Sequence, residues 1–121
     1  MPMKRVLAVD DSRTIRDLLC LALREGGFDP HCAEDGLHGL EIIETVDPHV
    51  IITDINMPRL DGFGFIERVR RHVKFSQTPI LALTTETAPA LRARARDLGA
   101  TGWIVKPFVS SKLIRALSLV T

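Results

Sequence analysis

The fold is decided by the stretch Val50-Ile51-Ile52-Thr53-Asp54-Ile55-Asn56-Met57-Pro58-Arg59-Leu60-Asp61-Gly62, near the middle of the chain. Its first four residues are apolar or β-branched, which predicts a short strand buried on both faces. Asp54 follows at the carboxyl end of that strand, before the chain breaks at Pro58. A carboxylate in this position is a helix cap, a solvated loop residue or part of a site.

Four similar apolar runs surround this strand in the sequence, and each is followed by a helical pattern. We expect strands over residues 6–9, 29–33, 50–53, 80–83 and 103–105. Each strand is followed by apolar residues at a spacing of three and four, which is typical of an amphipathic helix. The first of these helices carries Ile15, Leu18, Leu19, Ala22 and Leu23, and the third carries Phe63, Ile66, Val69 and Val73.

Polar residues and glycines mark the ends of these helices. Ser12, Asp35 and Asp61 are expected to cap the first three helices, because short polar side chains accept hydrogen bonds from the first backbone N–H groups. The fourth helix is expected from about Thr87 to Leu98, and the last after a cap at Ser110 or Ser111.

Strands that alternate with amphipathic helices predict a parallel sheet covered on both faces. For five strands, the flavodoxin-like order 2-1-3-4-5 is the simplest doubly wound arrangement. We therefore expect one α/β domain over residues 1–121, with five parallel strands, five helices and no further output domain.

Composition narrows the class of protein. The 121 residues include 16 basic and 15 acidic ones, a net charge of +1 that argues against nucleic acid or a membrane surface as the main partner. No apolar run is long enough to span a bilayer, and the first residues do not resemble a signal peptide. We expect a cytoplasmic monomer, with Cys20 and Cys32 both reduced and with no metal site among the scattered histidines.

Polar side chains follow four of the predicted strands. Asp10 and Asp11 follow the first strand, Asp54 the third, Thr84 the fourth and Lys106 the fifth. The carboxyl ends of parallel strands lie at one edge of the sheet, and the first and third strands flank the crevice where ligands bind in such folds. Topology alone therefore predicts that these side chains are close together.

Crowded carboxylates repel one another and favour a cation, and oxygen ligands favour a hard ion such as Mg²⁺. With a lysine and a hydroxyl nearby, they supply the groups needed to hold a phosphoryl group, and one carboxylate could be the nucleophile. Each residue taken alone has a simpler interpretation. Asp10 or Asp11 could cap the first helix, Thr84 could be an ordinary strand end, and Lys106 could be a solvated loop lysine.

Taken together, these motifs resemble the receiver domain of two-component response regulators, over the whole chain. The resemblance rests on Asp10-Asp11, on Asp54-Ile55-Asn56-Met57-Pro58 with Asp61-Gly62, on Thr84, and on Lys106-Pro107-Phe108. The sequence is most similar to the single-domain chemotaxis regulators of the CheY type. The resemblance implies a protein that is not an enzyme in the usual sense, and that catalyses only its own Mg²⁺-dependent phosphorylation and dephosphorylation.

The resemblance also implies roles for individual residues. Asp54 is expected to accept a phosphoryl group from a histidine kinase of the CheA type or from acetyl phosphate. Mg²⁺ is expected to bind Asp10, Asp11 and Asp54 and the backbone carbonyl of Asn56, with Asp10 acting largely through water. Lys106 and Thr84 are expected to contact the phosphoryl group, Asn56 and Glu86 to tune its lifetime, and the Lys106–Pro107 bond to be cis.

One residue departs from the family pattern. The switch aromatic before Lys106 is often Tyr or Phe in this family, whereas the matching position here is Trp103. Phosphorylation is expected to draw Thr84 and Trp103 inward and to change the surface formed by the fourth helix, the fifth strand and the last helix. That surface carries Arg92, Arg94, Arg96, Lys112 and Arg115.

Several outputs fit this pattern. The resemblance implies binding to the flagellar motor switch, or a role as a phosphate sink that drains the kinase. A phosphatase with an aspartyl-phosphate intermediate is a different class, and those of the haloacid dehalogenase type need a second Asp where this chain has Asn56. A dinucleotide site would need a glycine-rich turn after the first strand, which this sequence does not have.

Overall fold

The computed structural model describes residues 3–121 and contains a five-stranded parallel sheet in the order β2-β1-β3-β4-β5. The strands are β1 (Arg5–Val9), β2 (Asp29–Ala33), β3 (Val50–Thr53), β4 (Ile80–Thr84) and β5 (Gly102–Val105). The helices are α1 (Arg13–Glu25), α2 (Gly36–Val46), α3 (Gly62–Arg71), α4 (Pro89–Leu98) and α5 (Ser110–Val120). The predicted α/β doubly wound fold and strand order are confirmed.

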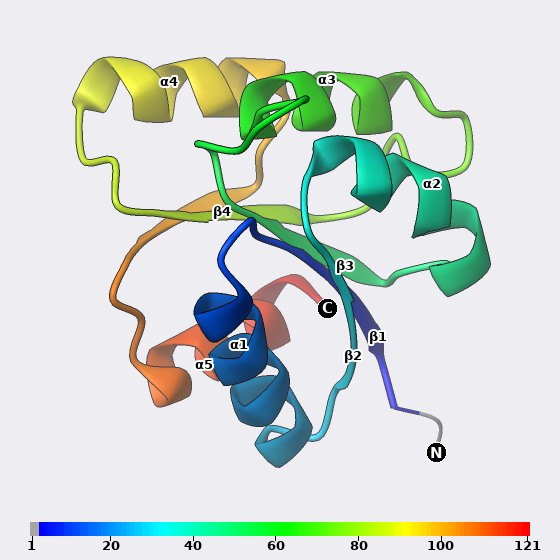
Figure 1. Cartoon of the computed structure of the whole chain (residues 1–121), viewed down its shortest axis with the longest axis vertical. Coiled ribbons are helices and arrows are strands. Elements are labelled where there is room, and N and C mark those ends of the chain that lie inside the picture. Colours follow the sequence, from blue (N-terminus) through cyan, green and yellow to red (C-terminus); the bar gives the residue numbers. More distant parts are fainter. Residues whose placement is uncertain (1–2) are drawn as a thin grey trace.

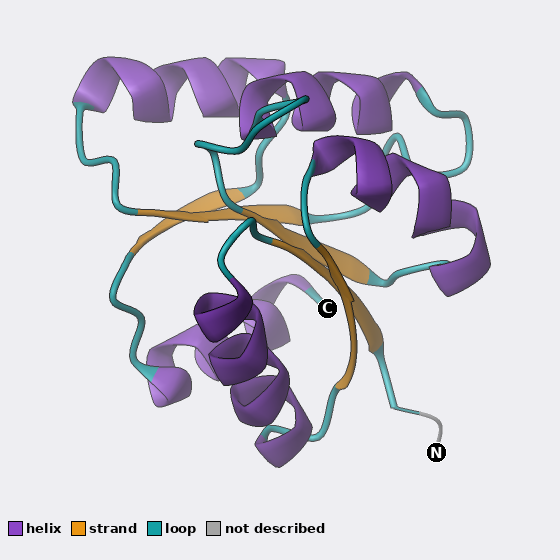
Figure 2. Ribbon diagram, in the orientation of Figure 1, coloured by secondary structure: helices purple, strands orange, loops and turns teal. Residues whose placement is uncertain are grey.

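The helices cover both faces of the sheet. Figure 1 shows α1 and α5 on one face and α2, α3 and α4 on the other, and Figure 2 shows the strands as a single layer between them. Two apolar clusters fill the spaces between the layers, and every residue of β3 is buried. Within residues 3–121, no helix is both long and apolar enough to cross a membrane.

Side chains cap the first three helices as predicted. Ser12 accepts a hydrogen bond from the Ile15 N–H, Asp35 from the His38 N–H and Asp61 from the Gly64 N–H. The expected cap at Ser110 or Ser111 is wrong, because Val109 occupies the N-cap position and Ser110 is already helical. Helix α4 begins at Pro89 rather than near Thr87, since the fixed φ of proline favours the first helical position.

Two apolar residues lie outside the core in which they were predicted. Helix α3 ends at Arg71, so Val73 is not part of it and is 95% exposed. Leu18 is 49% exposed, because α1 packs on the sheet through the narrower stripe of Leu19, Ala22 and Leu23. A turn near the end of a helix and the width of its buried stripe depend on neighbouring elements, which apolar spacing alone does not encode.

Asp35 ties the start of α2 to the loop after β3. Its side chain is buried, and it accepts two hydrogen bonds from Arg59, at 2.6 Å and 2.9 Å, beside the capping bond from His38. The hydrogen bonds from Arg59 and the His38 N–H hold the pKa of Asp35 below its usual value, although burial opposes them. Arg59 itself has a left-handed backbone, with φ of 66°.

We expect Asp35→Ala to lower the free energy of unfolding by about 1–3 kcal/mol, because it removes a helix cap and leaves a guanidinium without its partner. Asp35→Asn keeps a capping acceptor and loses only the charge, so its loss should be smaller. Since folding lowers the pKa of Asp35, the charge stabilises the fold at neutral pH and ceases to do so as the pH falls through the folded pKa.

Urea denaturation at about pH 7 and about pH 3 measures both effects. The difference between the wild type and Asp35→Asn should shrink at the lower pH. Asp17→Asn, an exposed carboxylate of α1, serves as the control. Equal stability of the wild type and Asp35→Ala at neutral pH would contradict this role.

Candidate functional site

Three carboxylates meet at the carboxyl edge of the sheet. Strands β1 and β3 pair with Val9 opposite Thr53, so Asp10 and Asp54 leave the sheet side by side. Oxygens of Asp10, Asp11 and Asp54 all lie within 4.8 Å of one another. Asp10 and Asp54 are 1% and 7% exposed, and Asp11 is exposed at the mouth. The structure therefore brings together the carboxylates that the topology predicts.

Lys106 supplies the positive charge in this pocket. Its Nζ lies 2.6 Å from Asp10 Oδ2 and 3.3 Å from Asp54 Oδ2, and its side chain is only 10% exposed. Burial alone would lower the pKa of Lys106, but the hydrogen bonds and charges of Asp10 and Asp54 outweigh it and raise that pKa. Lys106 is therefore cationic at neutral pH. The Lys106–Pro107 bond is cis, as the resemblance implied.

The backbone after β3 fixes one oxygen of Asp54. Asp54 Oδ1 accepts a hydrogen bond of 2.7 Å from the Ile55 N–H, which leaves Oδ2 as the oxygen beside Lys106. The N–H of Gly62 donates to the Ile55 carbonyl, and a side chain at position 62 would collide with the Asp54 carbonyl oxygen. Only glycine fits this close approach, which explains the Asp61-Gly62 pair.

Burial is the largest influence on the pKa of Asp54. It raises the pKa of Asp54 above the usual value, and the neighbouring charge of Asp10 raises it further. The charge of Lys106 and the hydrogen bond from Ile55 oppose this rise without cancelling it. The ionised Asp54 is thus held in an unfavourable environment, a property common among reactive groups.

Two hydrogen bonds to Asp10 were not predicted from the sequence. The N–H of Ser12 donates to Asp10 Oδ1 at 2.9 Å, and the Arg16 guanidinium donates to the Asp10 carbonyl at 2.8 Å. The first contact follows from an Asp two residues before a helix cap, a common turn signal. The second joins the first turn of α1 to the site, and no spacing rule would have revealed it.

The loop after β4 covers the other side of the site. Thr84 is buried at the end of β4, and its hydroxyl accepts a bond from the Glu86 N–H. The Glu86 carboxylate accepts a bond of 2.8 Å from the Asn56 amide, and its carbonyl accepts one of 3.1 Å from the Trp103 indole N–H. Glu86 therefore connects Trp103 on β5 to the loop that follows Asp54, a link the sequence did not reveal.

The donor set suits a hard divalent cation. Three carboxylates and one lysine give the pocket a formal charge of −2, from three negative charges and one positive charge. Carboxylate and carbonyl oxygens are the ligands that Mg²⁺ prefers. Of the predicted ligands, Asp10, Asp11 and Asp54 form the cluster, and Asn56 lies two residues after Asp54.

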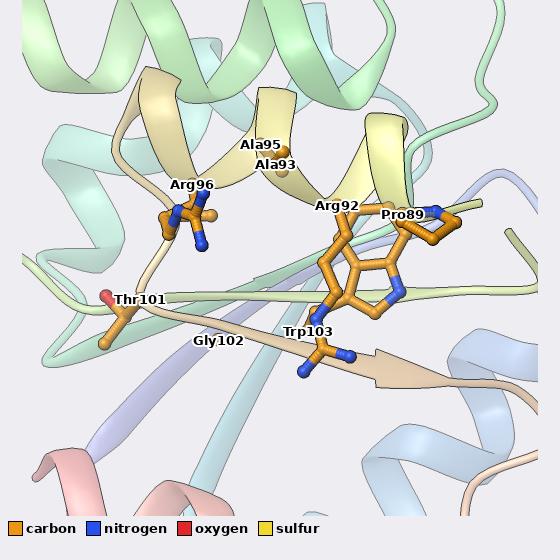
Figure 3. Close-up of a pocket in the computed structure, with 9 residues that line it drawn as sticks. Pro89, Arg92, Ala93, Ala95, Arg96, Thr101, Gly102 and Trp103 are labelled. Atoms are coloured by element: carbon orange, nitrogen blue, oxygen red, sulfur yellow. The ribbon is translucent and has the colours of Figure 1, made fainter. Parts of the chain in front are cut away.

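A separate pocket of about 490 Å³ lies between α4 and β5. Figure 3 shows Trp103 and Arg92 side by side at one end of it and Arg96 at the other. Arg94, predicted to belong to the same surface, instead stacks over the Phe63 ring of α3, with 4.1 Å between its guanidinium carbon and the ring centre. The pocket therefore has Arg92 at the end with Trp103, which contacts the Glu86 loop, and Arg96 at its far end (Figure 3).

Comparison with known proteins identifies this arrangement. A family model described as "Response regulator receiver domain" matches residues 6–118. The chain is 38% identical to a probable chemotaxis protein CheY of Rhizobium etli over 117 residues. The matched region covers 96% of this chain and 91% of that protein. It is 33% identical to protein PilG of Pseudomonas aeruginosa, over 93% of this chain and 84% of that protein.

A solved structure of chemotaxis protein CheY4 of Vibrio cholerae gives the same result for the fold. It matches with a TM-score of 0.95 and 42% sequence identity, over 99% of this chain and 100% of that chain. Sequence, strand order and the arrangement of the carboxylates and the lysine therefore agree. The chain belongs to the response regulator receiver domain family of two-component signalling proteins.

Proposed function

We propose that this protein is a phosphorylation-controlled regulator of a chemotaxis-type pathway in the cytoplasm, and that Asp54 is its phosphoacceptor. The observation that carries this proposal is the buried Asp54 carboxylate, with one oxygen fixed by Ile55 and the other 3.3 Å from Lys106. The phosphodonor in this proposal is a histidine kinase of the CheA type. Acetyl phosphate is a small alternative donor that transfers the same phosphoryl group by breaking a phosphorus–oxygen bond.

In the proposed reaction, Asp54 attacks the phosphorus of a phosphohistidine. A bond forms between the carboxylate oxygen and phosphorus as the phosphorus–nitrogen bond of the donor breaks. Lys106 is proposed to pair with the phosphoryl group once it is attached. Its ammonium would exchange a carboxylate oxygen for a phosphoryl oxygen within the same pocket. The Thr84 hydroxyl, at the end of the neighbouring strand, is the group proposed to donate to another phosphoryl oxygen.

The cation in this proposal is Mg²⁺, held by Asp11 and Asp54, by the Asn56 carbonyl, and by Asp10 largely through water. When bound, it neutralises charge on the carboxylates and the transferring phosphoryl group. Asn56 and Glu86 join across the mouth of the pocket through a hydrogen bond of 2.8 Å. Because this exposed bond joins the loop after Asp54 to the loop after Thr84, we propose that the pair tunes the lifetime of the phosphoryl group.

Phosphotransfer tests the central proposal. With Mg²⁺ and radiolabelled acetyl phosphate, the wild type and the exposed-carboxylate control Asp17→Asn should be labelled, and Asp54→Asn should not, because an amide oxygen is a poor nucleophile. Removing Mg²⁺ with a chelator should abolish the labelling. Equal labelling of the wild type and Asp54→Asn would overturn the proposal.

Trp103 is proposed as the residue that reports phosphorylation to the surface. Its indole N–H donates to the Glu86 carbonyl, and Glu86 is two residues after Thr84. Movement of Thr84 toward a phosphoryl group would shift the Glu86 carbonyl and so the indole. The added charge of about −1.5 to −2 then favours one of two arrangements of α4, β5 and α5.

Fluorescence can follow this residue alone, because the chain contains one tryptophan and no tyrosine. Adding beryllofluoride with Mg²⁺, which mimics the phosphoryl group, should move the emission to shorter wavelength as the ring becomes more buried. Asp54→Asn should show no such change. Identical spectra of the wild type with and without beryllofluoride would show that Trp103 does not report activation.

The surface of α4, β5 and α5 is proposed to bind an acidic partner, and the flagellar motor switch protein is the partner proposed. Arg92 and Arg96 line the pocket beside Trp103, and Lys112 and Arg115 are exposed on α5. Relatives named for chemotaxis support the pathway. The alternative output is a phosphate sink, in which the protein drains the kinase without binding the motor.

Binding to purified motor switch protein separates the two outputs. Beryllofluoride should strengthen binding of the wild type, and Arg92→Glu should weaken it roughly tenfold, about 1.4 kcal/mol, by replacing attraction with repulsion. Arg68→Glu, on an exposed position of α3, is the control with the same charge change. Rapid phosphotransfer to Asp54 without any beryllofluoride-dependent binding would favour the sink.

A further inference from the structure

Two cysteines face each other where α1 packs on β2. Cys20 lies on α1 and Cys32 on β2, and their Sγ atoms are 2.6 Å apart. Both are free thiols, and both are only partly buried. We propose that Cys20 and Cys32 are a modification site, where a low-molecular-weight disulfide such as glutathione disulfide oxidises the two thiols reversibly to an intramolecular disulfide.

The geometry favours an internal bond over other products. Two cysteines form a disulfide without backbone movement only when their side chains already point toward each other, and these two sulfur atoms are in contact. Helix α1 packs directly on β2, so the pair bridges two neighbouring elements rather than two loops. The chain contains only two cysteines, so no other internal pairing is available.

The surroundings of the two thiols affect how fast they react. Burial, together with the hydrogen bond to Cys20, raises the pKa of Cys32 to about 12, although the charges of Arg16 and Arg24 oppose the rise. Thiolates are the attacking species, so we expect oxidation of the pair to become faster as the pH rises. Because the two sulfur atoms are in contact, either thiol can attack first and the other can complete the bond.

One of the two thiols, after losing its proton to water, attacks one sulfur of glutathione disulfide. A mixed disulfide forms, and the first glutathione leaves as a thiolate. The other protein thiol then loses its proton and attacks the sulfur of the first cysteine, and the second glutathione leaves. The two protein thiols are oxidised by two electrons, and one glutathione disulfide is reduced to two glutathione molecules.

The Cys20–Cys32 disulfide would link the edge strand β2 covalently to α1. Strand β2 is one of the two edge strands of the sheet, and it pairs with β1 alone among the described strands. A disulfide between α1 and β2 would hold that edge against its covering helix. By the loop-closure argument, a short loop of this kind raises the thermal midpoint by roughly 5–10 °C in a domain of this size.

The experiment treats the full chain with glutathione disulfide at neutral pH, blocks free thiols with N-ethylmaleimide and measures the intact mass. We expect an unlabelled monomer that has lost two hydrogens and has a higher thermal midpoint, and we expect dithiothreitol to reverse both changes. Two alkylated cysteines after this treatment, or a disulfide-linked dimer, would overturn the proposal.

Single-cysteine variants test the need for both thiols independently of phosphorylation. Cys32→Ser and Cys20→Ser should each stop at one bound glutathione, because neither variant has a second thiol to displace it. Absence of bound glutathione from both variants, under conditions that oxidise the wild type, would contradict the proposed mixed disulfide. A cycle of oxidation and reduction that leaves Asp54 labelling intact would separate this site from the phosphoacceptor.

Discussion

The site depends on repulsion between carboxylates that the sheet forces together. Because β1 and β3 are parallel neighbours, Asp10 and Asp54 leave the sheet on the same edge, with Asp11 beside them. Lys106 offsets part of this negative charge but not all of it. Folding therefore maintains an excess of negative charge that a cation can relieve.

The loops around this charge are held by hydrogen bonds and close backbone packing on both sides. Gly62 allows the start of α3 to approach the Asp54 backbone, and Asp35 anchors the same loop through Arg59. On the other side, Glu86 receives bonds from both Asn56 and Trp103. Preorganisation of this kind holds the Asp54 carboxylate in one orientation. One side of the site is tied to α2 and α3, and the side with Thr84, Glu86 and Trp103 is tied to β5.

The sequence predicted the sheet, its order and the polar residues at its edge, because strand periodicity and parallel topology are written in local patterns. Predictions failed where a neighbour decides the outcome, as at Val73, Leu18 and Ser110. The Trp103–Glu86 and Arg16–Asp10 bonds join a side chain to a backbone carbonyl, and such acceptors are present at every residue. Residue identity therefore carries no signal for them. The roles of Asp54, Thr84 and Lys106 remain predictions, although their placement is now established.

The stacking of Arg94 on Phe63 has a mechanical consequence. Phe63 follows Gly62, whose N–H bonds to the loop directly after Asp54, so the middle of α4 is joined to the start of α3. The loop before α4 is joined separately to β5 through Trp103. Helix α4 is therefore held at its middle by α3, whereas the loop that leads into it is held by β5. Displacement of the Glu86 loop would act on the first turn of α4, while the Arg94 contact would hold the middle of the helix against α3.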